Sequence, residues 1–140
     1  MTKEDKNLLI HDLCARLPYG VKIHIGKTQR IEVFDDINLR IGSINNTYAD
    51  IKPYLFPLSS MTEEQKFECL KGTNLEIDKH GDIVVKDDCY GGSKYTDLEM
   101  YLEVIDWLNK NHFDYRSLIP KGLAIDATGL NIYKHEQTIK

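Results

Sequence analysis

The residues best suited to chemistry lie between positions 112 and 116, at the end of a long helical pattern. His112, Asp114 and Arg116 bring an imidazole, a carboxylate and a guanidinium close together in the chain. Such a set can transfer protons or hold an anion through charge-assisted hydrogen bonds. The structural alternative is that His112 caps the helix and Asp114 pairs with Arg116, and we favour it because helix ends routinely recruit such groups.

A second candidate is the glycine-rich loop that precedes this helix. Gly91 and Gly92 leave backbone N–H groups free to hold a phosphate or carboxylate, and Lys94 adds a positive charge. Tyr90 and Tyr95 flank the loop, and tyrosine is enriched at protein interfaces. A loop without a ligand is the commoner outcome for such a segment. The candidate binding residues are therefore Tyr90, Lys94, Tyr95, His112, Asp114 and Arg116.

Two further motifs resemble catalytic signatures and are better interpreted as turns. Residues 26–28 (GKT) imitate the end of a phosphate-binding loop, but the preceding glycine, Gly20, lies six residues back and a strand pattern intervenes. Residues 126–129 (DATG) resemble the aspartic-protease triplet, except that an alanine separates Asp126 from Thr128. A turn in which these side chains bond nearby backbone explains the second motif.

Metal and thiol chemistry are not indicated by the sequence. The five histidines and three cysteines share no ligand spacing such as Cys-x-x-Cys. Cys89 stands beside Asp87 and Asp88, and adjacent carboxylates disfavour the reactive thiolate. We expect free thiols in a reducing compartment, with neither a metal site nor a cofactor.

The composition is that of an ordered domain. The chain has 140 residues, of which 41% are hydrophobic and 29% are charged, and its net charge is -4. Its basic residues are scattered singly, which makes nucleic acid an unlikely partner. The polar N-terminus has no signal-peptide core, and no long apolar run occurs, so we expect a cytoplasmic protein without a membrane contact. The oligomeric state stays open.

Hydrophobic periodicity predicts three helices. The first covers residues 3–17 after a cap at Thr2, and a short second helix starts after Thr62 and stops at Gly72. The third begins near Thr96 and should be long and the most buried of the three. Its expected apolar face consists of Leu98, Tyr101, Leu102, Ile105 and Leu108, widened by Val104 and Trp107.

Alternating apolar residues predict about five strands. Three form an antiparallel meander over residues 21–44, and a hairpin around Gly81 supplies two more, which either extend the sheet or stand beside it. Pro53 and Pro57 argue against a central strand at residues 51–58, so we expect an extended segment there. The expected fold is a single α+β domain over residues 1–130, with a frayed tail at residues 131–140.

Several segments resemble a family of short uncharacterised proteins from gut Bacteroidetes, which often occur near phage-like or mobile regions. The segments are residues 13–21 (LCARLPYGV), 51–62 (IKPYLFPLSSMT), 104–109 (VIDWLN) and 113–124 (FDYRSLIPKGLA). The resemblance implies a genomic context and no activity.

Two functions are consistent with these features. The first is a small cytosolic accessory protein that binds another macromolecule, expected to be a protein, through exposed aromatic residues such as Tyr48, Tyr90 and Tyr95. The alternative is an enzyme or small-ligand binder whose site lies between residues 112–116 and the loop at 90–94. The absence of a convergent catalytic set favours the first.

Overall fold

The computed structural model of the chain describes residues 2–26, 29–35, 51–73, 75–85 and 98–133. These ranges form a mixed α+β fold with the N-terminal helix first, which confirms the predicted class. The elements are α1 (Lys3–Arg16), η1 (Leu17–Tyr19), β1 (Lys22–Ile25), β2 (Arg30–Val33), β3 (Ile51–Pro57), η3 (Leu58–Ser60), α3 (Glu63–Leu70), β4 (Leu75–Ile77), β5 (Ile83–Val85), α4 (Leu98–Lys110), β6 (Phe113–Asp114) and β7 (Ile125–Asp126).

The main sheet is mixed, in the order β2-β1-β3-β6, with β7 also pairing with β3. β1 runs antiparallel to both β2 and β3, whereas β6 and β7 run parallel to β3. The third strand of the predicted meander falls at residues 37–44, outside the described ranges. β4 and β5 form a separate two-stranded sheet, so the hairpin stands beside the main sheet and does not extend it.

The expectation that prolines exclude residues 51–58 from the centre of the sheet is wrong. Pro53 lies opposite Ile23 at the end of the pairing with β1. From the next residue onward β3 forms backbone hydrogen bonds with the segments of β7 and β6. Ala127 N–H donates to Leu55 O, and Phe56 N–H donates to His112 O, each at 2.8 Å. Because β3 changes partners directly after Pro53, the missing proline N–H interrupts no continuous ladder.

Side-chain caps fix the starts of α1 and α3, as the sequence predicts. Thr2 accepts a hydrogen bond from Asp5 N–H at 3.0 Å. Thr62 accepts from Gln65 N–H at 3.1 Å, while the Gln65 amide oxygen accepts from Thr62 N–H at 2.9 Å. This reciprocal pair is a capping box, and it ties the Gln65 side chain to the first turn of α3.

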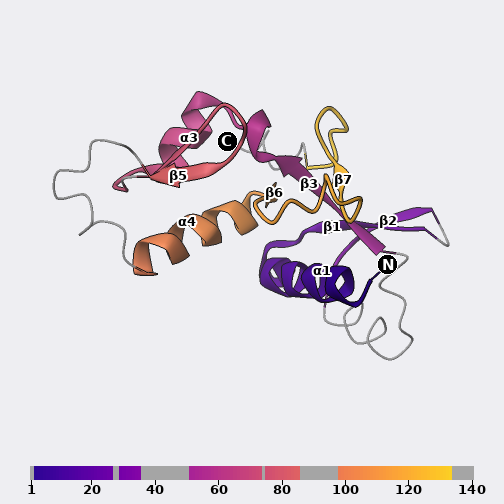
Figure 1. The fold of residues 1–140 in the computed structure, drawn as a ribbon. Coiled ribbons are helices and arrows are strands. Elements are labelled where there is room, and N and C mark those ends of the chain that lie inside the picture. Colours follow the sequence, from indigo (N-terminus) through magenta and orange to yellow (C-terminus); the bar gives the residue numbers. More distant parts are fainter. Residues whose placement is uncertain (1, 27–28, 36–50, 74, 86–97, 134–140) are drawn as a thin grey trace.

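Burial on α4 differs from the predicted apolar face. Val104 and Leu108 are buried, whereas Tyr101 and Leu102 are exposed. The core-facing side of α4 therefore combines Leu108 of the expected stripe with Val104, which the sequence adds only as a widening of it. Neighbouring elements decide this: α4 contacts α3, β6 and α1, and its C-terminal half lies against them (Figure 1).

Three hydrophobic clusters fill the interior of the described ranges. One lies between α1, β1 and β3, and another joins α3, the β4–β5 hairpin and α4 around Phe113. The third is small and consists of Tyr54, Ala127 and Tyr133. Figure 1 shows α1 beside the sheet at one end and α3 with β5 at the other, with α4 extending between them. Tyr133 is only 3% exposed although it lies within the predicted frayed tail, so the chain packs at least to that residue.

Candidate functional site

Only half of the predicted site lies within the described residues. Tyr90, Lys94 and Tyr95 lie outside the described ranges. His112 and Asp114 are buried, and Arg116 is half-buried.

Asp114 and Arg116 each bind another partner, so the predicted pair between them is wrong. The Asp114 carboxylate accepts hydrogen bonds from Leu118 N–H and Ile119 N–H, both at 2.9 Å. The chain turns back after β6 and presents these two amides to it, which gives Asp114 a structural function. Arg116 instead forms an ion pair with Asp12 of α1, with Nε 3.4 Å from Oδ1.

Asp12 is the centre of a buried polar cluster. Arg16 donates to both of its oxygens, from Nε at 2.8 Å and from Nη2 at 3.2 Å, and both side chains are fully buried. Arg16 Nη2 also donates to Phe113 O at 2.6 Å, so the cluster ties α1 to β6. Both guanidinium groups lie against the Tyr115 ring, 5.3 and 5.2 Å from its centroid. The burial of Asp12 and Arg16 makes this a structural cluster.

His112 is a buried residue at the end of α4. Its backbone has a φ of +66°, and its N–H donates to Asn109 O at 3.2 Å, so it ends α4 through the backbone. Burial, together with the charges of Arg16 and Lys22, lowers the His112 pKa to about 4. The imidazole is therefore neutral near pH 7.

Tyr133 fixes the last described segment to the sheet. Its hydroxyl accepts a hydrogen bond from Lys22 N–H at 2.8 Å and donates one to Tyr54 O at 2.9 Å. Its ring stacks on His112, with centroids 3.9 Å apart and planes inclined by 13°. The segment after β7 thereby forms a wall beside the end of α4.

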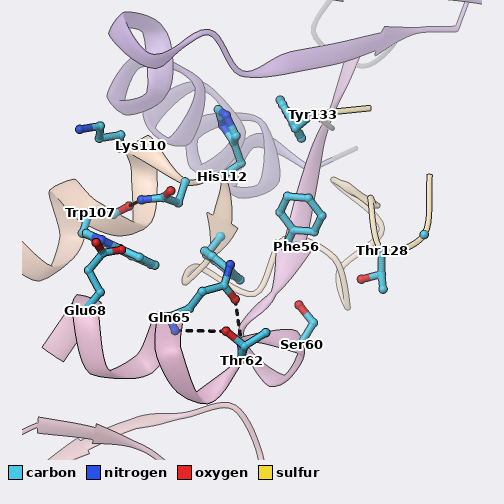
Figure 2. Close-up of a pocket in the computed structure, with 13 residues that line it drawn as sticks. Phe56, Ser60, Thr62, Gln65, Glu68, Trp107, Lys110, His112, Thr128 and Tyr133 are labelled. Carbon is cyan, nitrogen blue, oxygen red and sulfur yellow. Dashed lines mark hydrogen bonds between the residues drawn. The ribbon is translucent and has the colours of Figure 1, made fainter. Parts of the chain in front are cut away.

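A pocket of about 420 Å³ lies between this wall, α3 and the end of α4 (Figure 2). We call it the aromatic pocket. Its lining residues are Phe56, Ser60, Thr62, Gln65, Glu68, Trp107, Lys110, Asn111, His112, Phe113, Thr128, Gly129 and Tyr133. Its volume lies in the lower part of the range of about 300–1,000 Å³ that is typical of small-molecule sites.

Five rings form a continuous chain along the aromatic pocket. Trp107 stacks on Phe113 at 5.8 Å with planes inclined by 14°, and Phe113 contacts Phe56 at 5.7 Å. Phe56 in turn contacts Tyr133 at 5.8 Å, and Tyr133 stacks on His112. Trp107 and Phe56 are only half-buried, so parts of their surfaces are left for a ligand. Figure 2 shows Trp107 on one side of the pocket and Phe56 with Tyr133 on the other.

Gln65 supplies a polar group to this apolar surface. Its amide oxygen is held by Thr62 N–H, and Figure 2 shows the amide reaching from α3 toward the space between Trp107 and Phe56. Gln65, Trp107 and Tyr133 line the pocket but are not among the residues predicted for a site, although the hydrophobic pattern places Trp107 on a helix. Only the tertiary fold brings these three residues together, because Phe56 and the segment after β7 complete the pocket.

A second hollow, of about 700 Å³, lies between the β4–β5 turn and the loop after β6. Its buried acid is Asp114, which is already bound to two backbone amides. Asp78 accepts from His80 N–H and Asp82 N–H in the adjacent turn, and these bonds lower its pKa. Because Asp114 and Asp78 both hold backbone amides, the aromatic pocket is the better candidate.

The described ranges contain no group of three or more His, Cys, Asp or Glu side chains arranged to hold a metal ion. Burial raises the pKa of Cys69 to about 12, which keeps it as a thiol. Within the same ranges, no helix has the length and apolar character needed to cross a bilayer. Comparison with protein-family models, with curated proteins and with solved structures finds no match to this chain.

Proposed function

We propose that this protein binds a small molecule in the aromatic pocket. The observation that carries the proposal is the combination of a pocket of about 420 Å³, a chain of contacting aromatic rings and the Gln65 amide directed among them. The lining combines these rings with polar side chains from α3, α4 and the segment after β7. Small-molecule sites use aromatic side chains to bury the ligand and polar groups to orient it. The site differs from the predicted one, since it joins His112 to α3 and the segment after β7.

Binding without catalysis fits the chemistry of the lining better than an enzyme does. His112 is neutral and buried, and Asp114 and Arg116 belong to structural contacts. The charged residues of the lining, Glu68 and Lys110, are exposed. An exposed carboxylate and ammonium lack the desolvation that tunes catalytic groups.

The single tryptophan of the chain makes the test direct, because Trp107 lines the pocket. A ligand that enters should change the Trp107 emission in a saturable way. Thr128→Tyr adds bulk to the pocket lining and should weaken binding at least about tenfold, which corresponds to roughly 1.4 kcal/mol. Leu130→Tyr is the matched control, since Leu130 lies two residues away and does not line the pocket. If a diverse panel at millimolar concentration leaves the emission unchanged, the proposal fails.

A protein partner is the second candidate function, and one observation favours it. Phe67 is 70% exposed in the middle of α3, and Leu102 on α4 is 55% exposed. Large exposed apolar side chains often mark contact surfaces. Phe67→Ser should then abolish capture of a specific partner that the unmodified protein retains, while ligand binding in the aromatic pocket is unchanged.

We also propose a cytoplasmic location and the phage-like or mobile genomic context that the family resemblance implies. The resemblance and the absence of an apolar run in the sequence support this. Fractionation of cells that express the chain tests the location, and recovery in the membrane or secreted fraction would contradict it.

A further inference from the structure

The hydrogen-bond polarity of Gln65 is fixed by the protein backbone. Thr62 N–H is a donor, so the Gln65 atom that faces it at 2.9 Å must be the amide oxygen. The usual ambiguity between the oxygen and nitrogen of a side-chain amide therefore does not arise here. The Gln65 Nε2 group, on the other branch of the amide, is left as a hydrogen-bond donor on the pocket side of α3.

Asn111 has the opposite polarity by the same reasoning. Its Nδ2 donates to Trp107 O at 2.9 Å, and a carbonyl can only accept, so the atom in this contact must be nitrogen. Its Oδ1 is left as an acceptor in a residue that lines the same pocket. The lining thus includes one residue with an amide donor, Gln65, and one residue with an amide acceptor, Asn111.

The apolar part of the lining selects for a flat ring. Trp107 and Phe56 present half-exposed aromatic surfaces, and both are held by contacts to Phe113. Stacking of a heteroaromatic base on such a side chain contributes about 1–3 kcal/mol. An aliphatic ligand of equal size would lose this term and keep only the gain from apolar burial.

The charges around the pocket do not favour an anion. Glu68 and Lys110 place one negative and one positive charge on the lining. At the N-terminus of α3, Thr62 caps the N–H of Gln65, and the first turn carries the acidic side chains of Glu63 and Glu64, which oppose a phosphate there. A neutral polar ring fits this balance better than a phosphate or a carboxylate.

We infer that the aromatic pocket binds a planar heteroaromatic ring that carries a lactam edge, meaning a ring carbonyl beside a ring N–H, as in the oxo forms of purine and pyrimidine bases. The carbonyl accepts from Gln65 Nε2, the ring N–H donates to Asn111 Oδ1, and the ring stacks between Trp107 and Phe56. This inference rests on the proposed small-molecule function and names its ligand class.

The test uses a matched pair of nucleosides and the emission of Trp107 in the full chain. Inosine carries the lactam edge, and purine riboside is the same molecule without the carbonyl and ring N–H. We expect inosine to bind at least about tenfold more tightly, because purine riboside leaves both amides without partners. Equal affinities would overturn the inference without the need for any variant.

Gln65→Glu then identifies the residue that recognises the carbonyl. Glutamate at this position keeps the capping box, since its carboxylate still accepts from Thr62 N–H, but the donor becomes an acceptor. Inosine affinity should fall at least about tenfold, and purine riboside affinity should change little. Phe67→Glu adds the same charge to α3 outside the pocket and should leave both affinities unchanged.

The possible results separate this inference from the proposed function. If inosine retains its preference in Gln65→Glu, the assigned recognition is wrong. If neither nucleoside binds while other aromatic compounds change the Trp107 emission, the lactam class is wrong and the pocket still binds small molecules. If no compound in a diverse panel binds, the proposed function fails as well.

Discussion

The imidazole of His112 lies flat on the phenol ring of Tyr133, with the ring centroids 3.9 Å apart. His112 ends α4 in a left-handed backbone conformation, and Tyr133 belongs to the last described segment. The stack therefore joins two distant parts of the chain at a wall of the aromatic pocket. The hydroxyl of Tyr133, held between Lys22 N–H and Tyr54 O, connects this wall to β1 and β3.

Stability should decrease as the pH falls from about 6.5 to about 4. Folding lowers the His112 pKa from its ordinary 6.5 to about 4, so the unfolded chain binds more protons in this window. This lowering of the His112 pKa by about 2.5 corresponds to roughly 3 kcal/mol of folding stability, and this contribution is fully lost below the folded-state pKa. Urea denaturation at a series of pH values between 4 and 7.5 measures the loss.

His112→Asn is the matched variant for this pH dependence, because asparagine tolerates a positive φ and does not titrate here. The variant should be less stable at pH 7, since the stack on Tyr133 is lost. Its stability should fall less steeply than that of the unmodified chain between pH 6.5 and 4. Parallel pH profiles for the two proteins would contradict the assignment to His112.

Tyr133→Phe should lower the free energy of unfolding by about 1–3 kcal/mol, because Lys22 N–H and Tyr54 O each lose a buried partner. Tyr19→Phe is a suitable comparison. The Tyr19 hydroxyl hydrogen-bonds the Asp106 carboxylate in an exposed contact, so water can replace it. Chemical denaturation should show the larger loss for Tyr133→Phe, and equal losses would argue against a wall anchored by this hydroxyl.

Local signals in the sequence are enough to place the starts of α1 and α3 and the hairpin. Thr2 and Thr62 cap α1 and α3, and the turn around Gly81 joins β4 to β5. The sheet was harder to predict, because a proline such as Pro53 usually indicates that a central strand is interrupted. It is tolerated in β3 because the strand changes partners at that point, and no local pattern encodes this exchange.

The site was predicted only in part, for a similar reason. The sequence drew attention to His112, Asp114 and Arg116 because they are neighbours in the chain. Their actual partners lie far away: Arg116 pairs with Asp12, and His112 stacks on Tyr133. Periodicity cannot reveal such pairs, since it reports which face of an element is apolar and not what that face meets.

Gly81→Ala should destabilise the hairpin beyond the usual cost of a left-handed residue. Gly81 has a φ of +85°, and a Cβ there would lie 3.2 Å from the Ser59 backbone nitrogen. Gly72 is the control, because its φ is +81° and a Cβ there meets nothing within 4 Å. We expect a loss of about 1 kcal/mol for Gly72→Ala and a larger loss for Gly81→Ala. Thermal unfolding of the two variants measures the difference, and equal melting temperatures would contradict the contact with Ser59.

Asp12→Asn should be the most damaging of the substitutions in the buried cluster. Asp12 neutralises Arg16, which is fully buried, and also pairs with Arg116. Breaking a buried ion pair by removing one partner costs about 3–5 kcal/mol, because the other charge is left uncompensated. Arg116→Ala should cost about 1 kcal/mol or less, since the Arg116 side chain is 30% exposed and water can replace the contact.

The double variant Asp12→Leu with Arg16→Met distinguishes two free energies. One is the net contribution of the ion pair to stability, and the other is the cost of leaving one of its charges buried without a partner. Leucine and methionine fill similar space without charge, so the double loss should be smaller than the sum of the two single losses. Urea denaturation of all four proteins gives the coupling energy. Additive losses would mean that Asp12 and Arg16 act independently, which their bidentate contact at 2.8 and 3.2 Å argues against. Arg16 also donates to Phe113 O, so part of its single loss should persist in the double variant as a weakened link between α1 and β6.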